Sequence, residues 1–388
     1  FDRALEAVKE LEDKPELYPS YYYKGNAYLY LENYEQAISS YNEVVSIDPT
    51  VKGVLLNRGV ALARLEGKEQ EALQDINAFI ESYPDEIKGH LNQGLIYILL
   101  ENYTSAIASF DRALKMEPNN DVALVNKGKA LMRTGEEEEA IALFDEVIDA
   151  NPQNAVALRS KAQVLEDQGL HSEALSVYEQ VIDIEPENSF AYFKKAGILY
   201  EQNNDVAAAL EAYNAALEVD PTLFIAAFQK ATMFFQEGLY EQSISASDAA
   251  LALQADQTRS YYTLHTIKGN AFNKLERYED AISAFDKASE IDSSDVGAPL
   301  SRGIALQRLE RYVDAAESYE LAVTLASSDM KPELYKQIAL CYSLGDKPEQ
   351  AFDSIESYIN TTQSIDKEFF DKSGFDSLRG DTRFTELL

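Results

Sequence analysis

Apolar residues recur along this chain at the three-to-four-residue spacing of one helix face, and the pattern returns at a fixed interval. Five segments show it most clearly, and each ends in a proline: YEQAISSYNEVVSIDP (34–49), YTSAIASFDRALKMEP (103–118), EEEAIALFDEVIDANP (137–152), HSEALSVYEQVIDIEP (171–186) and VAAALEAYNAALEVDP (206–221). The prolines at 49, 84, 118, 152, 186 and 221 are separated by 34 or 35 residues. Because proline lacks an amide hydrogen and collides with the preceding helical turn, each one is predicted to end a helix.

A second helical pattern fills the rest of each interval. It is opened by a Gly or Ala that follows Lys, Arg or Gln, as in YKGNAYLYL (23–31), NQGLIYILL (92–100) and NKGKALMR (126–133). One repeat is therefore predicted to contain two helices, a first helix A and a second helix B.

This period and these small residues resemble the tetratricopeptide repeat, a helix–turn–helix unit of 34 residues. In the numbering of that repeat, position 8 on helix A is small: Gly25, Gly59, Gly94, Gly128, Ala162, Gly197, Ala231, Gly269, Gly303 and Ala339. Position 24 on helix B is aromatic: Tyr41, Phe110, Phe144, Tyr178, Tyr213, Phe285 and Tyr319. Two helices approach closely only where the contact residue is small, and a large residue then fills the space beside it.

The resemblance implies an all-α fold, a right-handed superhelical solenoid with a short C-terminal capping segment. Ten repeats begin near residues 18, 52, 87, 121, 155, 190, 224, 262, 296 and 332, and together they form an array over 18–360. Residues 1–17 are predicted to be an N-terminal helix left from a repeat or cap, and residues 361–388 a C-terminal cap. The spacing lengthens across an irregular junction at 252–262, which we expect to change the pitch or to act as a hinge.

Composition favours a packed protein without a membrane span. The 388 residues are 46% hydrophobic and 26% charged, and no run approaches eighteen apolar residues, so no membrane insertion is expected. No targeting signal is visible, which favours the cytoplasm. Phe1 is not a translation start, so this expectation does not exclude a preceding signal or domain.

Residues that carry chemistry are scarce. His90, His171 and His265 do not form a metal-ligand pattern, and the acidic run at 136–139 begins a helix B, where the helix dipole favours it. Cys341 stands where a small apolar residue is usual, so we interpret it as buried rather than nucleophilic. We therefore predict no enzyme, no cofactor and no metal site.

Charge is unevenly distributed along the repeats. The formal net charge is −33, yet the first fourteen positions of the ten repeats hold 18 Lys or Arg and only 6 Asp or Glu. The resemblance implies that these A helices line the concave surface. Basic residues at position 7 are interpreted as structural, each pairing with a carboxylate of the next repeat: Lys24, Arg58, Lys127, Lys161, Lys230, Lys268 and Arg302.

The remaining cations and several aromatic residues form the predicted groove. Its residues are Tyr22, Asn26, Asn57, Lys88, Lys129, Arg133, Arg159, Lys194, Lys195, Phe228, Phe235, Lys274 and Arg308, with Arg64 and Lys336 on the same basic track. We hypothesise a non-catalytic scaffold or adaptor that binds an extended, acidic or carboxylate-bearing segment of a partner protein. The competing interpretation is that these cations only balance outer carboxylates through weak ion pairs. No nucleic acid is expected, because the long-range field repels phosphate.

Three alternatives stay open at this stage. Chaperone-binding members of the family grip a C-terminal carboxylate with five residues, of which Asn26, Asn57 and Lys88 match, whereas Tyr22 and Asn92 stand where a lysine and an arginine are needed. The chain is alternatively a regulatory or substrate-selecting arm of a larger enzyme or a secretion or assembly machine. Self-association is the third, through docking of the segment FDRALEAVKEL on the last repeat of another chain.

Overall fold

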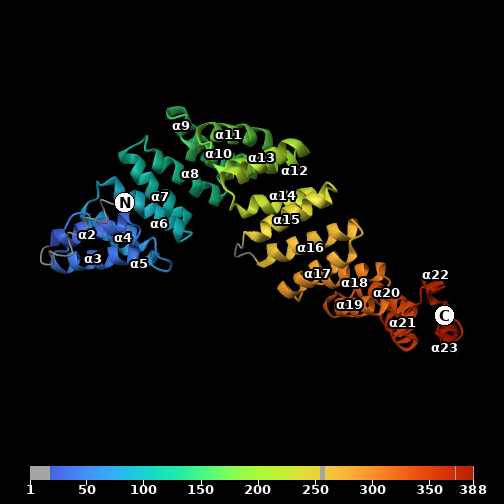
Figure 1. The fold of residues 1–388 in the computed structure, drawn as a ribbon. Coiled ribbons are helices and arrows are strands. Elements are labelled where there is room, and N and C mark those ends of the chain that lie inside the picture. Colours follow the sequence, from blue (N-terminus) through green and yellow to red (C-terminus); the bar gives the residue numbers. More distant parts are fainter. Residues whose placement is uncertain (1–17, 254–257, 372, 388) are drawn as a thin grey trace. The chain divides into compact units, whose positions relative to one another are not determined.

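The computed structural model describes residues 18–387 except 254–257 and 372 (Figure 1), and every regular element in these residues is helical. The described chain divides into two compact units, Phe1–Asn203 and Asn204–Leu388, which we call the N-terminal unit and the C-terminal unit. The N-terminal helix predicted over 1–17 lies outside the described residues, as do four residues of the 252–262 junction. The prediction of an all-α repeat array is confirmed, and the right-handed coil stays a prediction.

The N-terminal unit consists of helix pairs, each joined by a short turn. The pairs are α2 (Tyr18–Tyr30) with α3 (Tyr34–Ile47), α4 (Val54–Leu62) with α5 (Glu69–Ser82), α6 (Ile87–Leu99) with α7 (Tyr103–Met116), α8 (Asp121–Thr134) with α9 (Glu137–Ala150), and α10 (Ala155–Asp167) with α11 (His171–Ile184), followed by α12 (Ser189–Glu201). Each helix packs on the helix before and after it, so the core runs as a series of clusters between neighbouring pairs.

The C-terminal unit continues the same arrangement. Its helices are α13 (Val206–Val219), α14 (Phe224–Gln236) with α15 (Tyr240–Ala252), α16 (Thr258–Lys274) with α17 (Tyr278–Ile291), α18 (Gly297–Arg308) with α19 (Tyr312–Leu325), and α20 (Lys331–Leu344) with α21 (Pro348–Thr362). The chain ends in α22 (Lys367–Phe370), the 3₁₀ helix η1 (Ser373–Leu378) and α23 (Thr382–Leu387). Phe370 and Phe375 in this last segment are fully buried and pack into the same core as α20 and α21.

The two units meet in sequence between α12 and α13, the two helices of the predicted sixth repeat. We expected the point of weakest continuity at the 252–262 junction instead. There α15 and α16, on either side of residues 254–257, pack against each other.

The contact between a small residue on helix A and a ring on helix B is confirmed. A Cβ atom added to Gly128 would lie 2.5 Å from Cε1 of Phe144, and one added to Gly94 would lie 2.6 Å from Cε1 of Phe110. Both rings are completely buried. Glycine is required at these two positions because the aromatic ring occupies the space that any side chain would need.

The assignment of Gly197 as the small contact residue of the sixth repeat is wrong. A Cβ atom added there would meet nothing within 4 Å, whereas Ala196 has no exposed surface. The register of α12 is therefore shifted by one residue, and Lys195 immediately before Ala196 takes the place of a position-7 cation. Helix α12 begins at Ser189, consistent with this shift.

The turns between the helices of each pair require a residue with a left-handed backbone. This residue is a glycine in some turns, as at Gly135 (φ +84°), and a glutamate in others, as at Glu101 (φ +54°). A side chain in this conformation is strained by about 1–2 kcal/mol. The repeats therefore keep one backbone geometry even where the sequence does not supply the residue that suits it.

Five position-7 cations pair with a carboxylate as predicted, whereas Lys230 donates to the amide oxygen of Asn214 at 2.7 Å; the expectation that the carboxylate belongs to the next repeat was wrong. Lys161 Nζ lies 2.6 Å from Asp145 Oδ1, which belongs to the preceding repeat and not to the next one. Arg58 instead binds both carboxylate oxygens of Asp75 in its own repeat at 2.7 Å. Pairs with the preceding repeat also join Lys127 to Asp111, Lys268 to Asp248 and Arg302 to Asp286. Helix A packs beside the helix B that precedes it, which brings these carboxylates within reach.

Candidate interaction groove

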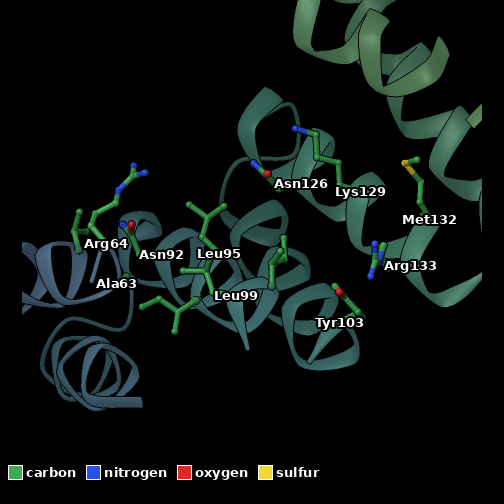
Figure 2. A pocket seen from close by; sticks show the side chains of 13 residues that line it. Ala63, Arg64, Asn92, Leu95, Leu99, Tyr103, Asn126, Lys129, Met132 and Arg133 are labelled. Atoms are coloured by element: carbon green, nitrogen blue, oxygen red, sulfur yellow. The ribbon is translucent and has the colours of Figure 1, made fainter. Parts of the chain in front are cut away.

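A hollow of about 520 Å³ opens on the A helices of three consecutive repeats in the N-terminal unit (Figure 2). Helices α4, α6 and α8 supply most of its lining, and Tyr103 at the start of α7 completes it. The lining residues are Val60, Ala63, Arg64, Asn92, Leu95, Ile96, Ile98, Leu99, Tyr103, Asn126, Lys129, Met132 and Arg133. None of these described lining residues carries a carboxylate.

Three cations stand at the edge of this hollow. Figure 2 shows Arg64 on one side of Leu95 and Leu99, with Lys129 and Arg133 toward the other. Within the described part of the chain, none of the three forms an ion pair with a carboxylate. The positive charge here is therefore not balanced by an ion pair with any carboxylate of the described residues.

Lys129 and Arg133 differ from each other in their surroundings. Burial, and to a smaller extent the nearby guanidinium of Arg159, lower the pKa of the Lys129 ammonium. Arg133 lies over the ring of Tyr103 with its guanidinium carbon 5.3 Å from the ring centroid. An incoming carboxylate would relieve the unfavourable environment of Lys129 and would meet an arginine whose orientation is already fixed.

Between these cations the floor of the hollow is apolar. Leu95 is 36% exposed and Leu99 is 55% exposed, so both present hydrocarbon to solvent rather than to the core. These two leucines and the cations on either side give the groove an amphipathic surface. Exposed apolar surface of this kind, with a polar rim, is typical of interaction sites.

Two asparagines add hydrogen-bond acceptors. The amide of Asn92 donates to the main-chain oxygen of Lys88 at 2.8 Å, and that of Asn126 donates to Val122 at 2.7 Å. Both donations use the Nδ2 group, so the Oδ1 atom of each asparagine is left to accept a hydrogen bond. A main-chain N–H of a bound peptide is a suitable donor.

The structure brings the predicted residues Tyr22, Asn26 and Asn57 together in one hydrogen-bonded network. Asn57 Nδ2 donates to Asn26 Oδ1 at 2.9 Å and to the hydroxyl of Tyr22 at 3.3 Å. The hydroxyl of the buried Tyr41 also donates to Asn26, at 2.8 Å. These side chains thus bind one another, and the amide that a carboxylate clamp would use on Asn57 is already engaged.

The predicted cations of the fifth and sixth repeats have partners. Arg159 pairs with Glu185 at 3.0 Å, and Lys194 pairs with Glu166 at 2.8 Å. Lys195 lies 2.8 Å from Glu179, in the same relation as the position-7 cations. For these three residues, the interpretation that the cations balance nearby carboxylates fits the structure better than a free groove.

One further cation of the basic track has a partner. Lys336, in the C-terminal unit, pairs with Asp366 at 2.9 Å. Of the predicted groove residues in this unit, Phe228 packs on Phe224 with ring centroids 6.1 Å apart, and Phe235 packs on Tyr240 at 5.7 Å. Both phenylalanines are half-buried, so they contribute to packing.

Three predicted cations are exposed outside the hollow. Lys274 ends α16 and Arg308 ends α18, both in the C-terminal unit. Lys88 is exposed on α6 in the N-terminal unit and does not line the hollow. Of the predicted groove cations, those that are both unpaired and grouped therefore belong to the second and fourth repeats.

Sequence reasoning missed the apolar part of this site. Val60 and Leu95 occupy repeat position 9, and Leu99 occupies position 13, which are groove positions in the family that the chain resembles. The predicted groove contains only cations, aromatics and asparagines at these positions, since leucine in a helical pattern is usual in a core. The available signal was that Leu99 aligns with Arg64 and Arg133 at the same position of neighbouring repeats.

Residues considered for catalysis do not line the hollow. Cys341 is completely buried in α20, and burial raises the pKa of its thiol to about 12. His90 is buried and lies 3.0 Å from the main-chain oxygen of Pro84. Over the described ranges no helix is long and apolar enough to cross a membrane.

Comparison with known proteins agrees with the repeat geometry. The chain is 31% identical over 127 residues to the Hsp70-Hsp90 organizing protein of Triticum aestivum, a match that covers 32% of this chain and 22% of that protein. It is 31% identical over 111 residues to DnaJ homolog subfamily C member 7 of Mus musculus, which covers 29% of this chain and 22% of that protein. The matches therefore span about a fifth of the length of these relatives.

A solved structure and several family models cover more of the chain. The C-terminal part of a TPR repeat-containing protein from Cytophaga hutchinsonii aligns with 65% of this chain and 98% of its own, with a TM-score of 0.52 at 18% identity, which shows a shared fold. Models described as Tetratricopeptide repeat match residues 18–51, 54–86, 194–260, 228–296 and 268–329, and the Cytochrome c-type biogenesis protein H TPR domain matches residues 76–192. The chain therefore belongs to the tetratricopeptide repeat family.

Proposed function

We propose that this chain is a non-catalytic adaptor that holds an extended, acidic segment of a partner protein against α4, α6 and α8. The observation that carries the proposal is the group of unpaired cations Arg64, Lys129 and Arg133 around a hollow with no carboxylate in its described lining. The chain as a whole is strongly acidic, with a net charge of −33 that already includes these three cations. An acidic ligand is therefore repelled by most of the surface and attracted at this groove.

Similarity to known proteins supports the adaptor part of the proposal. The chain is a repeat protein of a family whose members include a protein named Hsp70-Hsp90 organizing protein. The acidic nature of the ligand does not come from these relatives. It rests on the charges of this chain, because the groove offers cations and acceptors but no described carboxylate.

The experiment is a titration of the protein with a labelled, capped peptide rich in Glu and Leu. We expect the double variant Arg64→Glu/Arg133→Glu to weaken binding by at least about a hundredfold, since contacts between close charge pairs are worth roughly 1.5 kcal/mol or more each. Binding to the original chain is expected to weaken with added salt. Lys115→Glu is the control, because Lys115 is exposed on α7 outside the hollow.

An equal affinity for the original chain and the double variant would refute the proposal. Charge reversal at Lys194 and Lys195 is not suitable for this test. Those lysines pair with Glu166 and Glu179, so their reversal would disturb stability as well as binding.

A second candidate function is a partner-selecting arm within a larger protein. It is favoured by the size of the matches, which cover 32% of this chain but only 22% of the wheat relative. In the U-box domain-containing protein 70 of Oryza sativa the matching segment is 15% of the protein. The complete reading frame distinguishes an arm attached to another domain from a free-standing adaptor.

A further inference from the structure

Position 13 of three consecutive tetratricopeptide repeats lines the hollow on α4, α6 and α8, and the type of side chain differs among the three. Position 13 is Arg64 in the second repeat, Leu99 in the third and Arg133 in the fourth. A hydrocarbon side chain is therefore flanked by the guanidinium groups of Arg64, in the turn that follows α4, and of Arg133 on α8. Figure 2 shows this order, with Leu99 between the two arginines.

The distance between the arginines sets a length for the ligand. Packed helices lie about 8–10 Å apart, so two steps from α4 to α8 correspond to roughly 16–20 Å. An extended peptide rises about 3.3 Å per residue. About five or six residues would therefore connect a carboxylate at Arg64 with a carboxylate at Arg133.

The apolar floor of the hollow favours apolar peptide residues between those carboxylates. Leu95 and Leu99 are both exposed to the hollow, whose volume of about 520 Å³ lies within the roughly 300–1,000 Å³ of typical ligand pockets. Alternate side chains of an extended peptide point to the same side. Two apolar side chains at alternate positions would thus rest on the leucines while the acidic ends reach the arginines.

The asparagines favour a peptide over a small amphipathic anion. Asn92 and Asn126 each present an Oδ1 acceptor and the second N–H of Nδ2, because only one N–H of each Nδ2 group donates within its own helix. A peptide main chain supplies N–H donors along its length, whereas a fatty carboxylate has none. A phosphate backbone would satisfy the cations but not these acceptors.

We propose that this hollow recognises a short pattern in the partner: two apolar residues at alternate positions, enclosed by acidic residues about six positions apart, so that all four side chains point to the same side of the extended chain. This inference rests on the proposed function and adds the spacing and the apolar requirement to it. Leu95 and Leu99 are then specificity residues, and the arginines fix the register of the bound segment.

The test uses the full chain and the capped peptide Asp-Ser-Leu-Ser-Leu-Ser-Asp, whose only carboxylates are the two side chains. One control peptide has Ser in place of both Leu, and another places the two acidic residues side by side with the same composition. We expect the serine control to bind at least about tenfold more weakly, since burial of one leucine side chain contributes at least that factor. The clustered-acid control is expected to lose a similar factor, because only one of the two arginines can then meet a carboxylate. Binding of the first peptide is measured by fluorescence anisotropy.

Protein variants separate the apolar floor from the charges. Leu95→Ser/Leu99→Ser is expected to lose at least about tenfold in affinity for the first peptide. Leu321→Ser is the matched control, because Leu321 is 50% exposed on α19 in the other unit. Unchanged melting temperatures show that all variants are folded.

Each remaining outcome overturns the inference. One such outcome is that the serine peptide binds the original chain normally, and the first peptide binds the Leu95→Ser/Leu99→Ser variant normally but not the Arg64→Glu/Arg133→Glu variant. The groove then recognises charge alone, which rejects the pattern and leaves the proposed function standing. Equal binding of the clustered-acid peptide would show that the separation of the two acidic residues does not matter. Displacement of the peptide by decanoate at matching concentration would assign the hollow to a small anion, and absence of binding to the original chain would reject the pattern.

Discussion

Two glycine-to-alanine substitutions in the N-terminal unit are predicted to change stability in opposite directions. Gly128 and Gly197 both lie inside helices, on α8 and α12 respectively. Alanine is favoured over glycine in a helix interior by about 1 kcal/mol. At Gly197 nothing lies within 4 Å of the added Cβ atom, so Gly197→Ala is expected to stabilise the unit by up to about 1 kcal/mol.

At Gly128 the same methyl group meets a ring. The added Cβ atom would lie 2.5 Å from Cε1 and 2.7 Å from Cζ of Phe144, whereas carbon atoms pack at about 3.5–4.0 Å. Overpacking of a core costs about 1–3 kcal/mol, and the full burial of this ring places Gly128→Ala toward the upper end. After the gain in helix propensity is subtracted, a net loss of about 1–2 kcal/mol is expected.

Thermal unfolding followed by circular dichroism measures both effects. For a unit of this size 1 kcal/mol corresponds to roughly 2–4 °C, so Gly128→Ala is expected to lower the melting temperature and Gly197→Ala to raise it. Phe144→Leu in the Gly128→Ala background should recover part of the loss, because it removes the colliding atoms. Since repeat arrays need not unfold in one step, hydrogen exchange in α8 and α9 would locate the change. Equal or reversed shifts for the two glycines would refute the packing argument and the corrected register of α12.

Three further predictions concern the thiol, the turns and the clamp residues. Burial raises the pKa of the Cys341 thiol from 9.0 to about 12, so the unfolded chain ionises first and the thiol makes stability fall as the pH rises above about 9. Burial also raises the pKa of tyrosines such as Tyr178, so Cys341→Ala, measured by denaturant unfolding across that range, should show a smaller slope than the original chain, with the relative difference largest between about pH 9 and 10. Glu101→Gly is expected to stabilise by about 1 kcal/mol and Gly135→Ala to destabilise by a similar amount, because both residues have a positive φ, and melting temperatures of the two variants check this pair. Tyr22→Lys with Asn92→Arg is expected to create selectivity for a free acidic C-terminus over its amide, which peptide titration would detect and which the original chain should lack.

The repeat organisation could be predicted from the sequence because its causes are local. Proline ends a helix wherever it occurs, and the small residue and the ring that face each other, as in Gly128 and Phe144, are only sixteen positions apart. Each repeat needs only its neighbours to be stable, so one pattern recurs along the chain. The register of α12 was the exception, since Ala196 and Gly197 are both small and only packing distinguishes them.

The candidate site could be predicted only in part. The sequence placed four cations on A helices and did not distinguish among them as groove residues: Lys129, Arg133, Lys194 and Lys195. Packing decided among them, because the carboxylates Glu166 and Glu179 that neutralise the last two come from neighbouring helices.

The apolar floor also depended on tertiary structure. Leu95 and Leu99 read as ordinary helix residues in the sequence, and only the packing of α4, α6 and α8 leaves them exposed beside unpaired cations. Helix periodicity is a property of nearby residues, so the sequence alone determined the repeats. Which charges are neutralised and which leucines remain outside the core depends on distances between separate helices, and only the folded chain decides these.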